Sequence, residues 1–370
     1  MTPDPVTPDP VTPDPVTPGP VNPGPVTPGP VTPDPVNPDP VNVAAAPSGT
    51  RAGTDLLAAP GRAAAVDSGF RMLALGAGLL VLAVLAAIAV STTQKAWPAF
   101  RLEGLSYFTS SDWNPTQHRF GALAFIYGTV MVSAIAVAIG VPVSVGIALF
   151  TTEMAPRRLR SLVVTVVDLL AAVPSVVFGL WGLIVLAPWL DGIYDWISAR
   201  TRGVPVLSSL LAPGVSGTSY FTAGVVLALM ITPIVTSVAR EVFATVPAND
   251  RAGALALGAT RWEMIRGVVL PHATGGLVGA IMLGLGRAMG ETIAVALLIG
   301  GNPRIYASLF GPGDAMPSVI ARNLGDAGLY PDYRPALIGL GVTLFVIVVV
   351  VNAMARWGVG IAQRRMVGAR

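Results

Sequence analysis

The stretch LVGAIMLGLGRAMGETIAVALLIG, residues 277–300, is apolar except for its centre, where it carries two charged residues, Arg287 and Glu291. A charged side chain near the middle of a bilayer costs on the order of 3 kcal/mol, so such residues face a protein interior, pair with each other and mark solute paths. A spacing of four predicts that both lie on one face of a helix as an ion pair. A guanidinium also binds anions bidentately. The stretch therefore predicts a membrane-spanning helix that either lines an anion path or uses a buried pair to brace helix packing.

The composition indicates a polytopic membrane protein. Of 370 residues, 53% are hydrophobic and 12% charged, and the mean hydropathy is +0.67, which is far from the usage of soluble domains. Lys95 is the only lysine and the net charge of +3 comes from arginine, so nothing indicates a nucleic-acid partner. The chain has no cysteine, which excludes disulfides and cysteine metal sites, and its two histidines predict no metal centre.

Six apolar runs have the length that a helix needs to cross a hydrocarbon core of about 30 Å. We predict an all-α, six-helix transmembrane domain over residues 69–366. The predicted spans are Met72–Val90, Leu123–Phe150, Leu162–Leu186, Phe221–Val238, Leu277–Ile299 and Ala336–Ala355.

The first 40 residues are eight proline-rich pentapeptides such as VTPDP and VNPGP. Proline at every second or third position removes backbone donors and fixes φ, so these repeats favour an extended, polyproline-like chain without a core. An Ala/Gly/Ser-rich stretch continues to Ser68. We predict that residues 1–68 are a disordered tail and linker.

Charges beside the spans indicate the orientation. If the tail is cytoplasmic, fourteen arginines flank the inner ends of the spans and eight basic residues flank the outer ends. The positive-inside rule then places both termini in the cytoplasm of a multi-pass protein. The cluster Arg157–Arg160 contributes most to this asymmetry.

Residues 240–272 form a polar insertion between the fourth and fifth spans. Two amphipathic pieces flank Gly258, which predicts either a helix-turn-helix that docks a soluble partner or a purely structural hairpin. The core LALGATRWE, residues 255–263, and the following Leu270-Pro271 resemble the EAA loop of ABC-importer permeases. In that loop a Glu-Ala pair stands where this chain has Ala252 and Gly253. The resemblance implies that this segment docks an ATPase through Ala254, Leu255, Gly258, Ala259, Thr260, Arg261, Trp262 and Glu263.

Three further blocks narrow the resemblance. GRAMGET (286–292), DLLAAVPSVVFGLWGL (168–183) and FGALAFIYGTV (120–130) are similar to the PstC-type permease subunits of the Pst phosphate importer. The resemblance covers the first to the sixth span and implies that Arg287 and Glu291 are required for phosphate passage. It also implies several partners: a PstA-like second permease, an ATPase dimer, an extracytoplasmic phosphate-binding protein, inorganic phosphate and the lipid of a bacterial cytoplasmic membrane.

Other functions stay open at this level. Asp168 is a further intramembrane candidate for the solute path, or an ordinary carboxylate at the membrane interface. The chain has no G-x-x-x-x-G-K-[ST] phosphate loop, so ATP and magnesium are expected on the partner ATPase and no cofactor on this chain. Nothing suggests an enzyme. The alternatives are a permease for another oxyanion, an anion channel or secondary transporter without an ATPase, and a scaffold that recruits partners through its tail.

Deleting residues 1–40 is expected to leave transport nearly normal, because the repeats cannot contribute a packed core. Phosphate uptake by cells that carry the shortened chain, compared with the full chain at equal membrane level, measures this. A strong uptake defect would show that the tail takes part in transport.

Overall fold

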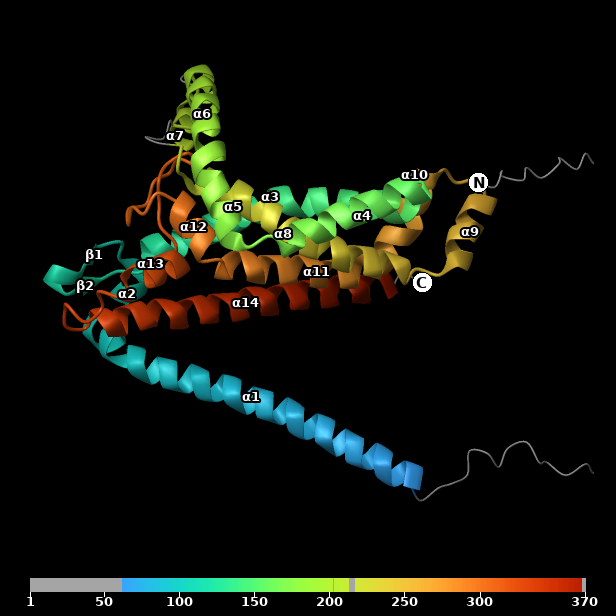
Figure 1. The fold of residues 1–370 in the computed structure, drawn as a ribbon, viewed down its shortest axis with the longest axis horizontal. Helices are drawn as coiled ribbons and strands as arrows, with labels where there is room; N and C mark the ends of the chain where they lie inside the picture. Colours follow the sequence, from blue (N-terminus) through green and yellow to red (C-terminus); the bar gives the residue numbers. More distant parts are fainter. Residues whose placement is uncertain (1–61, 202, 213–216, 368–370) are drawn as a thin grey trace, which may run out of the picture. The chain divides into compact units, whose positions relative to one another are not determined.

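The computed structural model describes residues 62–201, 203–212 and 217–367, and it is helical almost throughout (Figure 1). The repeats and most of the predicted linker lie outside these residues, and α1 already begins at Arg62. The described elements are α1 (Arg62–Glu103), α2 (Ser106–Thr109), β1 (Trp113–Asn114), β2 (Arg119–Phe120), α3 (Leu123–Leu149), α4 (Arg157–Ala172), α5 (Ser175–Trp181), α6 (Ala187–Thr201), α7 (Pro205–Leu210), α8 (Tyr220–Ala244), α9 (Ala248–Ala256), α10 (Arg261–Met264), α11 (Leu270–Gly290), α12 (Ile293–Leu298), α13 (Met316–Asn323) and α14 (Tyr333–Val367).

Six helical segments of the described chain are long and apolar enough to cross a membrane. This confirms the predicted six-span, all-α architecture. The segments are Asp67–Glu103, Leu123–Met154, Ser175–Thr201, Tyr220–Ala244, Arg261–Gly290 and Tyr333–Gly358.

α8 is the central helix of the bundle. Its most apolar stretch is 67% buried, whereas that of every other candidate span is at most 28% buried. Locally, the helix begins where the side chain of Ser219 accepts a hydrogen bond from the backbone N–H of Thr222, at 3.1 Å. α3 packs along α8, and α11 packs against both. The main apolar core therefore lies between these three helices.

Glycines bring α3 and α8 close together. A Cβ placed on Gly140 would lie 2.9 Å from the Ile231 side chain, and one on Gly224 would lie 2.5 Å from Ile135. Small residues at such positions allow backbones to approach, which is how membrane helices gain packing energy without a hydrophobic driving force. The approach also permits an interhelical hydrogen bond of 3.3 Å, which the Ser144 hydroxyl donates to the Thr232 carbonyl.

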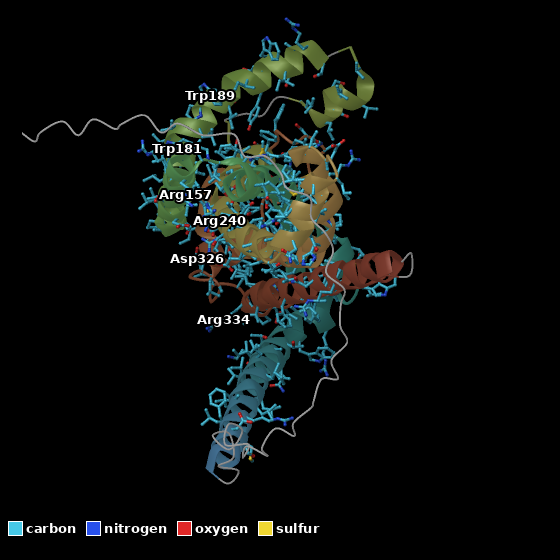
Figure 2. The ribbon with its side chains drawn as sticks, turned by 90° about the vertical axis from the view of Figure 1, so that its right-hand side faces the viewer. Arg157, Trp181, Trp189, Arg240, Asp326 and Arg334 are labelled. Atoms are coloured by element: carbon cyan, nitrogen blue, oxygen red, sulfur yellow. The ribbon has the colours of Figure 1, made fainter. Side chains whose placement is uncertain are left out.

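The predicted third span, Leu162–Leu186, is interrupted. α4 ends at Ala172, the backbone is extended at Val173 and Pro174, and helix resumes from Ser175. The residue before a proline is driven out of the helical region, so Pro174 ends one helix and starts the next. The apolar helical run therefore continues to Thr201 instead of ending at Leu186. Along this run Trp181 and Trp189 are exposed at the bundle surface (Figure 2).

Proline does not interrupt the other two helices in which the sequence offers a kink site. Pro142 lies inside α3 and Pro233 inside α8, and both helices continue through them. Membrane helices tolerate a proline when the surrounding structure satisfies the freed backbone groups.

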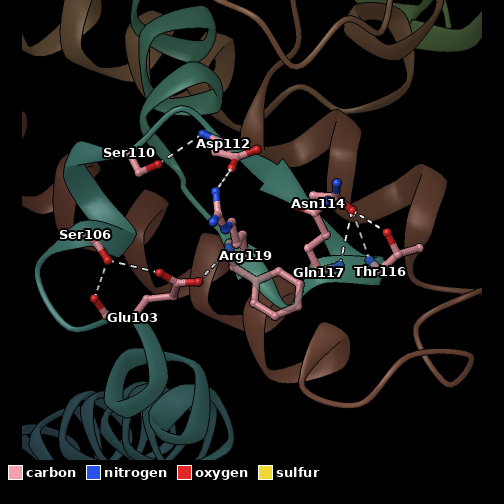
Figure 3. Close-up of polar contacts among 9 residues, drawn as sticks. Glu103, Ser106, Ser110, Asp112, Asn114, Thr116, Gln117 and Arg119 are labelled. Carbon is pink, nitrogen blue, oxygen red and sulfur yellow. Dashed lines mark hydrogen bonds and ion pairs between the residues drawn. The ribbon is translucent and has the colours of Figure 1, made fainter.

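A small hairpin closes the end of the bundle opposite α9 and α10 (Figure 1). β1 pairs antiparallel with β2, and Asn114 caps the turn between them by accepting hydrogen bonds from two backbone N–H groups. Arg119 contacts Asp112 at 3.0 Å, and the backbone N–H of Phe120 donates to Glu103 at 2.8 Å (Figure 3). These contacts fix the hairpin to the end of α1.

The loop before α13 is organised by one buried carboxylate. Asp314 accepts hydrogen bonds of 2.9 Å from the Ala315 backbone and from the Ser318 hydroxyl, and it pairs with the Arg322 guanidinium. Burial raises the pKa of the Asp314 carboxyl, and the nearby guanidinium acts in the opposite direction. This network holds the start of α13 against α3, where the Thr129 hydroxyl accepts from the Met316 backbone at 3.0 Å.

Gly128→Ala is expected to lower the stability of the bundle by about 1–3 kcal/mol, because the new Cβ would overlap the backbone carbonyl of Asp314. The apparent melting temperature in mild detergent measures the loss. Gly146→Ala on the same helix is the matched control, since a Cβ there meets nothing within 4 Å. Equal melting temperatures for the two variants would contradict this account of α3 packing.

Candidate functional site

Arg287 and Glu291 line one cavity of about 540 Å³ at the end of α11. The rest of its wall is apolar or glycine, and one residue comes from α8. The lining residues are Ile234, Leu283, Gly286, Arg287, Gly290 and Glu291.

α11 carries Arg287 but ends before it reaches Glu291. α11 stops at Gly290, Glu291 has an extended backbone with φ −68° and ψ 128°, and α12 begins at Ile293. The predicted continuous span Leu277–Ile299 is therefore wrong at its centre. Glycine has the lowest helix propensity after proline, and its place next to the break is consistent with this.

The break changes the relation between the two charges. Because Glu291 is outside the helix, it does not share a helical face with Arg287, and no ion pair joins them among the described residues. The predicted pair is wrong, although the prediction that both residues belong to one site is consistent with their common cavity. Arg287 is exposed in the isolated chain and Glu291 is half-buried.

Glu291 also faces a second, much smaller cavity toward α3. Thr129 and Ser133 of α3 line it together with Ala288 and Val295. The Ser133 hydroxyl is buried and has no hydrogen-bond partner in the described part of the chain. The sequence shows no signal for this contact, because Ser133 lies in an ordinary apolar run.

The glycines of α11 fall into two groups. A Cβ on Gly276 or Gly284 would lie 2.6 Å from Val242 or Val235 of α8, so these glycines serve close packing. Gly286 and Gly290, on either side of Arg287, have open space instead. No side chain at these two positions therefore crowds the guanidinium where it enters the cavity.

Asp168 is not part of this arrangement. It lies on α4, is exposed in the isolated chain, and lines neither of the two cavities that Glu291 borders. Its predicted role in translocation therefore stays a prediction.

The segment that resembles the EAA loop is a helical hairpin. α9 ends before Gly258, whose φ of +86° is a conformation that side chains with a Cβ rarely adopt. α10 starts with a capping box: the Thr260 backbone N–H donates to Glu263 at 2.8 Å, and the Glu263 N–H donates back to the Thr260 hydroxyl at 3.3 Å. Gly258 and this box set the angle between the two helices.

Large apolar side chains of the hairpin are exposed. Leu257 is 91% exposed, Trp262 62% and Leu255 45%, whereas Ile265 is buried against α8 and its neighbours. The predicted apolar face is thus divided: Ile265 anchors the segment to the bundle, and Leu255, Leu257 and Trp262 remain free. Ala254 and Ala259 are half-buried between them.

Arg251, a charged residue of α9, points inward. Its guanidinium lies 3.0 Å from the carboxylate of Glu153, at the end of α3, and the Glu153 side chain is only 7% exposed. Sequence reasoning missed this pair, because nothing in the spacing of two residues so far apart relates them. α4 begins at Arg157, and Arg240 lies near the end of α8.

Comparison with known proteins identifies the family. Residues 140–368 match the family described as binding-protein-dependent transport system inner membrane component. The phosphate transport system permease protein PstC of Mesorhizobium japonicum is 42% identical over 297 residues, which cover 80% of this chain and 90% of that protein. The chain belongs to the PstC-type permease family.

Other relatives extend this result. PstC of Haemophilus influenzae is 40% identical, covering 79% of this chain and 92% of that protein, and PstC 2 of Mycobacterium tuberculosis is 41% identical, covering 78% and 90%. A chain of a bacterial alginate ABC transporter, solved in complex with an alginate-bound periplasmic protein, aligns with a TM-score of 0.52 at 18% identity, covering 78% of this chain and 94% of that chain. The fold is thus that of ABC-importer permeases, and the predicted family is confirmed.

Gly258→Ala is expected to loosen the hairpin, because a left-handed backbone costs a residue with a Cβ about 1–2 kcal/mol. The rate of trypsin cleavage at Arg261 in detergent measures the opening, and a loss of this size predicts a rise of roughly 5- to 30-fold. Gly253→Ala in α9 is the matched control: it has open space and no positive φ, so cleavage is expected to slow. Equal cleavage of both variants would show that Gly258 does not set the hairpin angle.

Proposed function

We propose that this chain is the membrane permease subunit of an ATP-driven importer that carries inorganic phosphate across the cytoplasmic membrane. The observation that carries the proposal is the cavity in which Arg287, a cation without a paired carboxylate among the described residues, stands beside Glu291 in an otherwise uncharged wall. The similarity to PstC permeases supports phosphate as the anion.

The chemistry of the cavity suits transient anion binding. A guanidinium offers two parallel N–H donors to two phosphate oxygens. Glu291 supplies a negative charge at the edge of the same cavity, which opposes tight binding of an anion. A solute path needs contacts weak enough to release the solute.

The energy comes from another chain in this proposal. The exposed Leu255, Leu257 and Trp262 of the α9–α10 hairpin form an apolar surface on which a subunit of an ATPase dimer docks. ATP and magnesium are bound there and not by this chain, which has no phosphate loop. Hydrolysis is thus the ATPase's reaction, and this chain converts it into movement of membrane helices.

Further partners follow from the exposed surfaces. The face of α11 that carries Arg287 and Leu283 is exposed in the single chain, and a PstA-like second permease subunit covers it in the complex. The hairpin β1–β2 and the loop around α13, at the opposite end from α9, receive an extracytoplasmic phosphate-binding protein. Lipid covers the apolar sides of α1 and α14, such as Leu79 and Phe345.

The proposed location is the cytoplasmic membrane of a bacterium, with both termini in the cytoplasm. The arginine-rich ends of the spans and the α9–α10 hairpin then face the same side, which is the side where an ATPase has access to ATP.

Arg287→Gln is expected to lower ATP-dependent phosphate uptake by at least about 100-fold, because a bidentate contact to a charged group contributes on the order of 3 kcal/mol. Uptake is measured in vesicles that contain the purified complex, with sulfate and arsenate as competitors. The membrane level and the amount of co-purified ATPase are expected to stay unchanged.

Arg200→Gln on α6 is the control, since it removes an arginine that packs on Trp196 outside the cavity. Normal uptake by Arg287→Gln would contradict the site assignment. Uptake without ATP, or a complex that contains no ATPase, would contradict the proposal that this chain belongs to an ATP-driven importer.

A further inference from the structure

The α9–α10 hairpin is tied to α3 by a largely buried ion pair. Arg251 of α9 and Glu153 approach to 3.0 Å, and their side chains are only 25% and 7% exposed. Glu153 lies in a π-helical turn, residues 150–154, that ends α3. π-helical turns are rare and occur frequently at functional sites.

Both helices of the hairpin meet at Glu153. The Arg251 guanidinium also donates a hydrogen bond of 2.5 Å to the Phe243 carbonyl at the end of α8. From α10, the Arg261 guanidinium donates to the backbone carbonyl of Glu153 at 3.2 Å. A displacement of either helix of the hairpin therefore acts on the same residue of α3.

An apolar cluster also joins the hairpin to the bundle. Apolar packing is non-directional, so these side chains can slide against one another, whereas a charged pair with one partner constrains direction. The cluster consists of Ala148, Ala239, Phe243, Val246, Met264, Ile265, Val269 and Ala273.

The ion pair is incompletely satisfied in this arrangement. Arg251 Nε and Glu153 Oε1 are buried without a hydrogen-bond partner in the described part of the chain, although Arg251 Nη2 lies 3.0 Å from that oxygen. Buried polar atoms without partners are uncommon, and one explanation is stored strain. A second arrangement of the hairpin in which these atoms form hydrogen bonds would gain the free energy of those bonds. Two such competing arrangements are what a two-state element needs.

The opposite half of α3 borders the anion site. Thr129 and Ser133 line the small cavity that Glu291 also lines, and the buried Ser133 hydroxyl has no hydrogen-bond partner among the residues that the structure describes. α3 is one continuous helix from Leu123 to Leu149. It therefore connects the hairpin at one end with the surroundings of Glu291 toward the other.

We infer that Glu153 and Arg251 are positioning residues that couple the α9–α10 hairpin to α3, so that movement of a docked ATPase reaches the anion site through this helix. This inference rests on the proposed function for the identity of the docked partner and of the anion. The ion pair determines the direction in which the hairpin displaces α3, and the apolar cluster holds the two together. The displacement of α3 then changes the cavity at Ser133.

The first test measures phosphate transported per ATP hydrolysed by the complete reconstituted complex. Glu153→Gln removes the charge at constant shape, and the ratio is expected to fall at least about fivefold, the lower end of typical coupling effects. Arg251→Gln should give the same loss, and the double variant no further loss, because both remove one interaction. Asp195→Asn, which neutralises an exposed carboxylate on α6, is the control and should leave the ratio unchanged.

The second test does not depend on phosphate. The chain has no cysteine, so Ser133→Cys provides a unique thiol on α3. Its rate of maleimide labelling in the assembled complex is expected to change when ATP is added, and Glu153→Gln should abolish that change. A labelling rate that ignores ATP with Glu153 intact would overturn the inference, even if phosphate uptake is normal.

Folding and coupling can be separated by removing both charges. Replacing a buried ion pair by apolar residues of similar volume is often neutral or stabilising, so Glu153→Met with Arg251→Met is expected to assemble with its ATPase and yet remain uncoupled. Normal coupling in this double variant would refute the role of the pair. An intact complex that moves no phosphate but still shows ATP-dependent labelling at Ser133→Cys would refute only the proposed substrate.

Discussion

α8 packs against α3 and α11 at distances that only glycine permits. Gly140 and Gly224 allow α3 to approach, and Gly276 and Gly284 allow α11 to approach. Lipid is as apolar as leucine, so this close contact, and not the exclusion of water, holds the helices together. Arg287 takes its position from α11. One half of α3 borders the cavity of Glu291, and the turn that ends α3 contacts the hairpin.

The apolar pattern was sufficient to predict that six helices span the membrane, but not the bounds of the third and fifth. A bilayer requires about 20 uncharged residues per helix, and few other segments satisfy that condition. Helix interruptions were harder to predict. Pro174 is a visible signal, yet Pro142 and Pro233 have the same local signal and leave their helices intact. The outcome depends on the neighbours of each proline, which a single sequence does not show.

The sequence was enough to predict which residues border the candidate site, but not how these residues are arranged. Intramembrane charge was enough to select Arg287 and Glu291, and both border one cavity. Their spacing suggested an ion pair, but the backbone leaves the helical conformation at Glu291, and periodicity carries no information about such a break. Glu153 and Arg251 show the opposite case: nothing in the sequence relates the two residues, and only tertiary packing brings them together.

The open glycines beside Arg287 have a thermodynamic consequence. With no side chain at Gly286 or Gly290 to restrict it, the arginine keeps its rotamer freedom while no anion is bound. Fixing such a side chain costs about 2 kcal/mol of conformational entropy, which weakens anion binding roughly 30-fold relative to a rigid clamp with the same hydrogen bonds. Under the proposed function, the affinity of Arg287 for an anion is therefore limited by the entropy that its free side chain loses on binding, and the same entropy is regained each time an anion leaves.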